Sequence, residues 1–574
     1  MPQGRRRKPF SHKAKMQQKK KEQTNKLGSL SNRNVDRDER EEEGSSRSVL
    51  NVNDCKTSKV SSKPNRYALQ FYRETNAEIN ERKELACQSL NKAKKEDLEI
   101  DYDSCFVPEL DFPKRPSWNF MESLEKLNMK ENQYFTKYIS NIEKNFNWKE
   151  LGYFELNLET WRQLWRVLEM SDIVLFIVDI RFAGLMFPPS LYDYVAETLK
   201  RDMILVINKI DLAPTELVVA WKTYFQEKYP KLHILLFTTL PSYNLVGNQG
   251  SEGGLQSRRR RTKFQIAAEG TQLLIDVCKD IVGGEVDLSS WQEKVKVEMQ
   301  DSSHDDKVDV EELINVVKAD TEFFEHEKYK NGVLTIGCIG HPNVGKSSVI
   351  NAIMGKKVVS VSKTPGHTKH FQTIFVTKNV KLCDCPGLVF PSKVPKVLQV
   401  LMGCYPIAQL REPFTTVKFL AENLNLQKMM RLQHPENEDE WSAMDICEAW
   451  ARKRGFVTAK AARLDTYRAA NNLLRFALDG KICLCLKPPK FFENREFWCS
   501  HPENETVKWI MGNIVKQDAG DFHDETSDEE EEEAAVSESH ATNGSNSESN
   551  NEDTESSDND EPVSSNKFAA LSAD

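Results

Sequence analysis

The chain has 574 residues and a formal net charge of −8, with 39% apolar residues, below the roughly 45–50% typical of globular proteins. That charge conceals two opposite ends, because residues 1–26 carry ten Lys or Arg against one Glu, whereas residues 521–561 carry seventeen Asp or Glu and no Lys or Arg. No apolar run approaches the ~18 residues that cross a bilayer, no apolar stretch follows the basic N-terminus, and no cysteines have CxxC spacing. These features argue against a membrane, secreted or disulfide-stabilised protein.

Composition divides the chain into five segments. Residues 1–65 and 516–574 form a basic and an acidic tail, which we predict to be disordered because they hold too little apolar surface to offset the entropy of ordering. Residues 66–150 regain aromatic side chains and form an accessory segment. Residues 151–395 have an α/β pattern, interrupted by a charged insertion at about 284–330, and residues 396–515 have a helical pattern.

The α/β segment alternates helical periodicity with short apolar runs. A helix is indicated by Leu158, Trp161, Leu164, Trp165 and Leu168, which recur every three or four residues. Buried strands are indicated at Ile173–Val178, Met203–Ile207, Ile234–Phe237, Leu334–Ile339 and Val380–Leu382, and a loop with four arginines at 245–263. Strands separated by helices predict a parallel sheet, which binds ligands at the carboxyl ends of its strands.

A phosphate-binding motif follows the strand at 334–339. Residues 340–347, GHPNVGKS, match GxxxxGK[ST] between a strand and a helix, which is the context that a phosphate loop requires. In such a loop the backbone N–H groups surround the phosphates, the lysine reaches the β- and γ-phosphates, and the serine ligates Mg²⁺. The residues predicted to bind nucleotide here are Gly340, Asn343, Val344, Gly345, Lys346, Ser347 and Ser348.

Two further motifs follow in the order expected after a phosphate loop. Asp384 and Gly387 form DxxG at the end of a strand, where the aspartate would hold Mg²⁺ and the glycine N–H would contact the γ-phosphate. Thr368, in the preceding loop, is the candidate to close over Mg²⁺ when the γ-phosphate is present. Lys346, Asn343, Thr368 and Gly387 are therefore the candidates for stabilising the transferred phosphate.

A guanine motif lies earlier in the chain than the phosphate loop. Asn208, Lys209 and Asp211 form NKxD after a strand, and an aspartate here accepts hydrogen bonds that guanine donates and adenine does not. Thr239, after the next strand, is a candidate for a backbone contact to the base. This order is the reverse of that in ordinary G proteins, so we predict a circularly permuted P-loop GTPase domain. An ATPase remains the alternative that nucleotide competition would test.

These motifs resemble those of the circularly permuted GTPases of the YlqF/YawG family. The likeness extends over about residues 105–515 and includes NKID, GHPNVGKSS, LCDCPGL and the segment 445–475. The chain departs from the family at Asp179-Ile180-Arg181, where the family has DAR, and at Thr239-Leu240, where it commonly has Ser-Ala. The resemblance implies GTP hydrolysis with Mg²⁺ and a role in ribosome assembly.

The residue after DxxG bears on the rate of hydrolysis. Ras-like proteins have a glutamine there that orients the attacking water, whereas this chain has Leu388. We therefore expect slow hydrolysis without a partner, on the scale of about 10⁻⁴ to 10⁻³ per second. Asn343 resembles the asparagine of potassium-activated GTPases and predicts stimulation by K⁺; the alternative is that it only stabilises the loop through hydrogen bonds.

Charge also suggests partners and localisation. Residues 452–490 carry ten Lys or Arg against two Asp, which suits contact with RNA or pre-ribosomal particles. The basic N-terminal tail is typical of a nuclear or nucleolar address, with the cytoplasm as the alternative. The acidic tail, where Ser527 is a candidate phosphorylation site, could bind basic proteins. The chain could instead be a GTP-binding scaffold whose hydrolysis is incidental.

Overall fold

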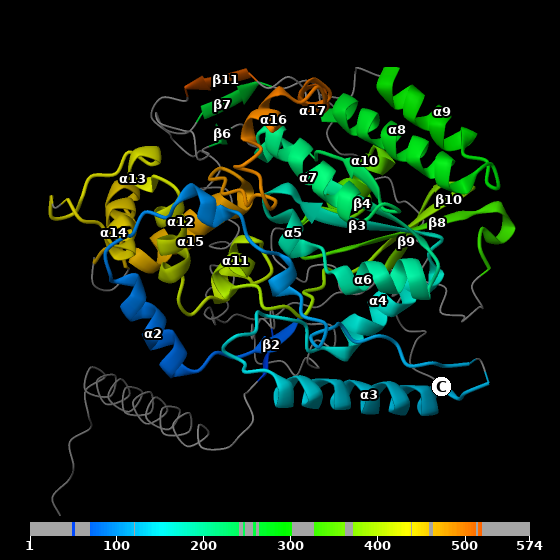
Figure 1. Cartoon of the computed structure of the whole chain (residues 1–574), viewed down its shortest axis with the longest axis horizontal. Helices are drawn as coiled ribbons and strands as arrows, with labels where there is room; N and C mark the ends of the chain where they lie inside the picture. Colours follow the sequence, from blue (N-terminus) through cyan, green and yellow to red (C-terminus); the bar gives the residue numbers. More distant parts are fainter. Residues whose placement is uncertain are drawn as a thin grey trace, which may run out of the picture. The chain divides into compact units, whose positions relative to one another are not determined.

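A six-stranded sheet with the order β5-β4-β3-β8-β10-β9 forms the core of the protein (Figure 1). Its strands are β3 (Ile173–Asp179), β4 (Asp202–Asn208), β5 (His233–Leu236), β8 (Leu334–Gly340), β9 (Gln372–Thr377) and β10 (Val380–Asp384). Neighbouring strands are parallel except for β9, which is antiparallel to β10. Strands β8 and β3 are adjacent, so the two halves of the sheet that the chain order separates are joined at its centre.

The computed structural model describes residues 49–51, 69–119, 121–239, 245–246, 256–259, 263–300, 327–361, 371–437, 439–458, 463–511 and 515–518. Thr368, Ser527 and nearly all of both predicted tails therefore lie outside the described residues. Among the residues described, no helix is long and apolar enough to cross a membrane.

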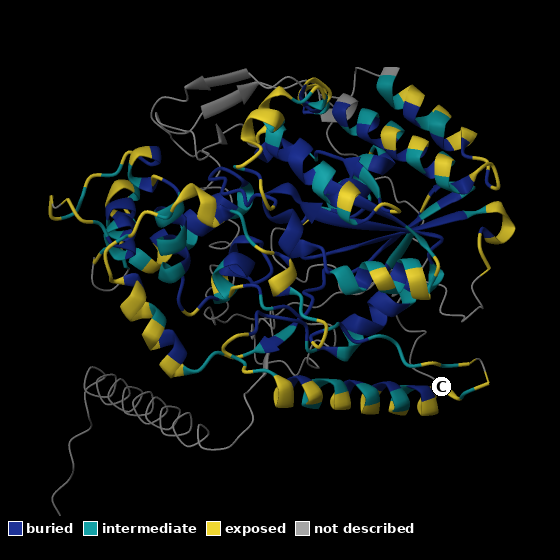
Figure 2. Cartoon of the chain, in the orientation of Figure 1, coloured by how far each residue is buried: buried dark blue, intermediate teal, exposed yellow. Residues whose placement is uncertain are grey.

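The predicted strands are present because each apolar run is buried on both sides. All seven residues of β3 are buried, and six of seven in β4 (Figure 2). Strand β9, at the edge of the sheet, alternates buried with partly exposed or exposed residues and was not predicted from its sequence. A parallel sheet followed by a helical region confirms the predicted fold class.

Seven helices accompany the sheet within the described residues. They are α4 (Leu158–Met170), α5 (Ala183–Met186), α6 (Pro189–Asp193), α7 (Thr215–Lys228), α8 (Lys263–Val282), α9 (Ser289–Gln300) and α10 (Lys346–Met354). Helix α4 contacts β8, while α10 contacts β8, β10 and α8. Helix α9 lies within the charged segment 284–330 and contacts α8, and its Trp291 and Val295 are buried.

The chain after the sheet forms a group of helices. These are α11 (Lys396–Leu401), α12 (Phe414–Asn423), α13 (Leu426–Met429), α14 (Ala443–Arg454) and α15 (Thr466–Asp479). Helix α14 begins at a capping box made by Ser442 and Asp445, and α15 ends at Gly480 in the left-handed conformation. Helices α16 (Arg495–Ser500) and α17 (Glu503–Ile510) instead contact α7.

The accessory segment contacts both the sheet domain and the helices. Its elements are β2 (Gln70–Tyr72), α2 (Asn76–Ala86) and α3 (Leu124–Asn145), and α2 packs on α12. Strand β1 (Val49–Asn51) pairs with β2 from within residues 1–65, so this short part of the tail that was predicted to be disordered is instead a strand. Strands β6 (Leu245–Val246), β7 (Gln256–Arg259) and β11 (Val515–Asp518) form a separate sheet, so part of the predicted loop at 245–263 is a strand.

The accessory segment and the residues just before α4 bind the chain that follows DxxG. The amide of Glu155 donates to the Val389 carbonyl at 3.1 Å, and the amide of Gly152 donates to the Ser392 carbonyl at 3.0 Å. From the other direction, the amide of Lys393 donates to the Cys105 carbonyl at 2.9 Å. The link from the DxxG motif to α11 is therefore bound along its length rather than exposed.

Candidate GTP-binding site

The phosphate loop connects the end of β8 to the start of α10, as its sequence predicts. Gly345 has a φ of +98°, and a Cβ atom there would lie 2.4 Å from Asn208 Nδ2, so only glycine fits. The ammonium group of Lys346 donates to the carbonyl oxygens of Gly340 at 3.2 Å and His341 at 2.7 Å. Burial lowers the pKa of Lys346, and Asp384 opposes that shift. Ser348 occupies the first turn of α10.

Ser347 and Asp384 come together at one end of the loop. The Ser347 hydroxyl donates to Asp384 Oδ2 at 3.5 Å, while Asp384 Oδ1 is buried and has no hydrogen-bond partner among the described residues. Burial raises the pKa of Asp384 to about 6, although Lys346 and Ser347 lower it. An unpartnered carboxylate oxygen beside a hydroxyl fits Mg²⁺, which binds oxygen ligands and offsets the phosphate charge.

Ser347 and Asp384 are the two predicted Mg²⁺ ligands that the described residues include, since Thr368 lies outside them. The described residues contain no group of three or more His, Cys, Asp or Glu that could hold a metal ion. Phosphate-dependent magnesium sites use one or two protein groups and the substrate phosphates.

The DxxG motif lies against the phosphate loop. A Cβ atom on Gly387 would be 2.8 Å from Pro342 Cα and 3.1 Å from Lys346 Nζ, which places the Gly387 backbone beside the loop lysine. The amide of Leu388 donates to the Gly340 carbonyl at 3.2 Å, and its side chain is only 1% exposed. Leu388 is therefore packed in the interior and offers no polar group to a water molecule.

The guanine motif meets the phosphate loop although 136 residues separate Asn208 from Val344. The Asn208 amide nitrogen donates to the Val344 carbonyl at 2.8 Å and to Thr239 Oγ1 at 3.5 Å, while its Oδ1 atom is buried and has no hydrogen-bond partner in the part of the chain that the structure describes. Lys209 Nζ donates to the Asn343 carbonyl at 2.7 Å. The structure thus brings Asn208, Lys209 and Thr239 to the loop, as a nucleotide site requires.

Asp211 is positioned by a residue that the sequence analysis did not select. The Thr238 hydroxyl donates to Asp211 Oδ1 at 2.7 Å, and both side chains are buried. Thr238 follows β5 directly, at the strand end where ligand-binding groups gather. Its position at a strand end could have marked Thr238 as a candidate. Its partner could not be predicted, because the contact joins residues that follow two different strands, β4 and β5.

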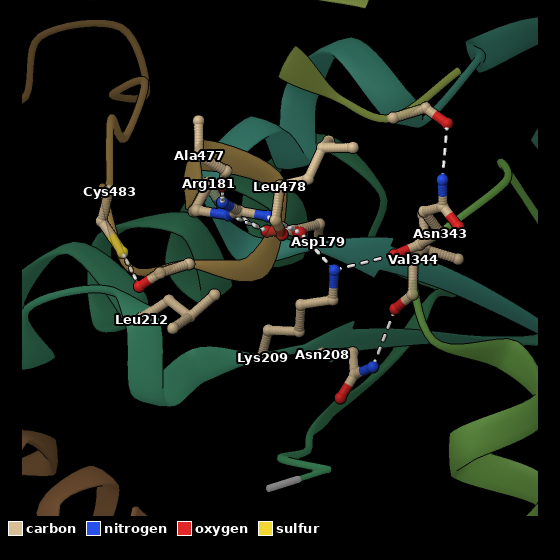
Figure 3. A network of polar contacts seen from close by, with 12 residues as sticks. Asp179, Arg181, Asn208, Lys209, Leu212, Asn343, Val344, Ala477, Leu478 and Cys483 are labelled. Carbon is tan, nitrogen blue, oxygen red and sulfur yellow. Dashed lines mark hydrogen bonds and ion pairs between the residues drawn. The ribbon is translucent and has the colours of Figure 1, made fainter. Parts of the chain in front are cut away.

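Asp179 and Arg181, which the sequence analysis named only as part of a family motif, and Gly403, which it did not name, also contact residues of the site. Asp179 forms ion pairs with Arg181 at 2.8 Å and with Lys209 at 2.9 Å (Figure 3). Burial raises the pKa of Asp179, but Arg181 and Lys209 outweigh this and hold it well below its usual range. The amide nitrogen of Asn343 donates to the Gly403 carbonyl at 2.9 Å, a contact with the helical region that no motif indicated.

His341 is not suited to acid–base chemistry. Burial, with Lys346 adding to it, lowers the pKa of His341 to about 3, so its ring is neutral in ordinary buffers. The ring lies 5.6 Å from that of Phe390, between centroids, in the segment after DxxG. His341 therefore packs the loop against that segment.

A phosphate loop, a DxxG motif and a guanine motif that precedes both in the chain define a circularly permuted P-loop GTP-binding fold. The family model described as 50S ribosome-binding GTPase matches residues 335–426. Guanine nucleotide-binding protein-like 1 is 50% identical in Mus musculus over 471 residues and 48% in Homo sapiens over 470, and each match covers 79% of this chain and 77% of the relative. The chain belongs to this guanine nucleotide-binding protein-like 1 family of circularly permuted GTPases.

Two more distant similarities accompany these relatives. The large subunit GTPase 1 homolog of Mus musculus is 32% identical over 426 residues, which are 66% of each protein. A solved structure described as GDP-bound TM YlqF matches 57% of this chain and 100% of its own with 16% identity and a TM-score of 0.31.

Proposed function

We propose that the protein hydrolyses GTP as a nucleotide-dependent switch in ribosome assembly or related handling of RNA–protein particles. The observation that carries this proposal is the direct contact of the phosphate loop with the helical region, through Asn343 and Gly403. The names of the matched family model and of the large subunit GTPase 1 homolog support a ribosomal role. Sedimentation of the protein with a non-hydrolysable GTP analogue, followed by identification of crosslinked RNA, tests it; no RNA or particle in the gradient would contradict it.

The exposed basic surface of α14, α15 and the turn between them is the proposed RNA contact. Arg452, Lys453, Arg463, Arg468 and Arg475 are exposed, whereas Lys481 and Lys487 are buried, so the surface charge is smaller than the sequence suggested. Arg452 also pairs with Glu448 at 3.2 Å. If Arg463, Arg468 and Arg475 contact RNA phosphates, the affinity for RNA should fall steeply as the salt concentration rises.

A triple charge reversal tests this surface. Arg463→Glu, Arg468→Glu and Arg475→Glu together should remove RNA crosslinking and reduce the salt dependence of binding. The matched control reverses three exposed lysines of α3, Lys126, Lys137 and Lys144, and should leave crosslinking unchanged. Equal losses in both variants would show that only net charge matters and would reject a specific surface.

We propose that hydrolysis is slow without a partner and faster in K⁺ than in Na⁺. The buried apolar side chain of Leu388 supports the first expectation. For the second, a cation would be bound by the oxygen end of the Asn343 amide, because the nitrogen end donates to Gly403. Single-turnover rates in KCl and NaCl test this, and equal rates would leave Asn343 with a structural role alone.

The scaffold alternative keeps GTP binding but assigns the activity to the acidic tail. Lys346→Ala and deletion of residues 521–561 distinguish the two. If Lys346→Ala abolishes partner release and the deletion does not, the protein is a switch. If the deletion abolishes it and Lys346→Ala does not, the protein is a scaffold for basic proteins. Nuclear or nucleolar localisation through residues 1–26 is part of the same proposal; a fluorescent fusion lacking them should be cytoplasmic, and unchanged localisation would reject that part.

A further inference from the structure

A continuous series of polar contacts leads from the phosphate loop to the C-terminal end of α15 (Figure 3). The Asn343 carbonyl accepts from Lys209 Nζ at 2.7 Å, and the same ammonium pairs with Asp179 Oδ2 at 2.9 Å. Asp179 also accepts from Arg181, with Nε at 3.0 Å from Oδ1 and Nη2 at 2.8 Å from Oδ2. Two buried side chains, Asp179 and Arg181, thus stand between Lys209 and the helical region.

Arg181 completes the series at the last turn of α15. Its Nη1 donates to the Ala477 carbonyl at 2.5 Å, and Nη2 lies 3.4 Å from the Leu478 carbonyl. The Gly480 amide also donates to the Ala477 carbonyl, at 3.2 Å, so Arg181 is a second donor to it. The C-terminal end of a helix carries partial negative charge, which makes a guanidinium group favourable there. Arg181 is 2% exposed and therefore depends on these protein acceptors rather than on water.

A second contact joins the same loop to the same helix end. Asn343 Nδ2 donates to the Gly403 carbonyl at 2.9 Å. Gly403 has a φ of +76°, and a Cβ atom on it would lie 3.0 Å from Asn343 Nδ2 and 3.3 Å from Leu478 Cδ2. Gly403 therefore sits between the phosphate loop and α15, independently of Arg181.

The charges make the two ends of this series interdependent. One buried carboxylate, Asp179, faces two cations, Lys209 and Arg181, and the end of α15 is the other negative group that Arg181 contacts. If the helix end moves away, Arg181 loses its carbonyl acceptors and pairs more strongly with Asp179. The ion pair between Asp179 and Lys209 is then weaker. Lys209 would then be less firmly held against the phosphate loop and the base site.

We propose that Arg181 is a positioning residue that couples guanine-nucleotide binding to the placement of the C-terminal turn of α15. Nucleotide that stabilises the phosphate loop stabilises this turn through Lys209, Asp179 and Arg181. Because such coupling is reciprocal, a partner that displaces α15 weakens nucleotide binding by the same factor. The DxxG segment is therefore not the only connection between the nucleotide and the helical region.

Hydrogen exchange with GDP as the probe tests the coupling. In the full-length protein, GDP should slow amide exchange in residues 476–482, and Lys137→Ala, at an exposed position of α3, should preserve this response. Arg181→Ala should lose the response and weaken GDP binding about tenfold, within the usual range for coupled sites. Arg181→Lys should recover part of the affinity but not the response, since an ammonium cannot reproduce the guanidinium fork.

Gly403→Ala provides a second route that leaves Arg181 in place. It should reduce the exchange response in residues 476–482 by disturbing the Asn343 contact. If the Arg181 variants do not fold, this variant alone tests the coupling. The proposal is overturned if GDP leaves exchange in this segment unchanged in the native protein. It is equally overturned if folded Arg181→Ala, or Gly403→Ala where no Arg181 variant folds, keeps the native response.

Discussion

Asn208 and Val344 are joined by a hydrogen bond of 2.8 Å from the side-chain amide of the first to the carbonyl of the second. Asn208 ends β4, in the half of the sheet that precedes the phosphate loop in the chain, whereas Val344 lies in the loop itself. This amide connects the guanine motif to the phosphate motif, together with Lys209 Nζ, which donates to the Asn343 carbonyl at 2.7 Å. In a permuted chain no short loop links them, so side-chain contacts across the sheet must align the two.

Asn208→Ala should weaken GDP binding about tenfold or more, because it leaves the Val344 carbonyl without its donor and loosens the loop. Titration of a fluorescent GDP derivative measures the dissociation constant. Asn132→Ala, which removes an exposed amide bonded only to the Asn128 carbonyl, is the control and should bind GDP normally. Equal affinity in the two variants would contradict an aligning role for Asn208.

Thr238→Val should reduce discrimination between GTP and ATP. The substitution keeps the shape of the side chain but removes the hydroxyl that holds Asp211 Oδ1 at 2.7 Å. A hydrogen bond to a charged group contributes about 1.5–3 kcal/mol, so we expect a loss of about tenfold in the preference for GTP. Competition between the two nucleotides measures it. Tighter binding of ATP than GTP by the native protein would overturn the assignment of Asp211.

Leu388→Gln should not accelerate hydrolysis, although it restores the residue that Ras-like proteins use. The side chain at this position is 1% exposed and its amide is bonded to Gly340, so a glutamine would be buried away from the phosphates. An unpaired buried amide costs about 1–3 kcal/mol, and the variant should unfold at lower urea concentration. Leu388→Met is the volume-conserving control. A faster single-turnover rate in Leu388→Gln would show that residue 388 reaches the nucleotide.

Glu155 should make the free energy of unfolding depend on pH. Burial raises the pKa of Glu155 to about 8 from an ordinary 4.5, against three backbone hydrogen bonds that lower it. The folded state therefore keeps a proton that the unfolded state loses, so this stabilisation is complete below pH 4.5 and disappears as pH rises through about 8. The slope is at most about 1.4 kcal/mol per pH unit.

Glu155→Gln should flatten that dependence, which urea unfolding at several pH values between 5 and 8 measures. Gln keeps an acceptor oxygen for the amides of Gln70 and Asn157 and has no titrating group. The exposed Glu150→Gln serves as the control and should follow the native protein. A native-like slope in Glu155→Gln would assign the pH dependence to other groups.

The sequence by itself determined the parallel sheet, the motifs at its strand ends and their permuted order. Apolar runs such as Ile173–Val178 identify buried strands without tertiary information, and nucleotide motifs are short because phosphate and base contacts come from neighbouring residues. Strand β9 was not predicted because an edge strand alternates buried with exposed residues and has no continuous apolar run. The burial of Lys481 and Lys487 could not be foreseen either, since charged residues are usually exposed.

Only the tertiary structure decided how the nucleotide site meets the helical region. Arg181 and Ala477 are 296 residues apart, and the bond between them uses a backbone carbonyl, which every residue has and no motif marks. Gly403 likewise contacts Asn343 through its backbone. Side-chain types can be recognised in a sequence, but acceptors supplied by the backbone are selected only when folding brings them within hydrogen-bonding distance.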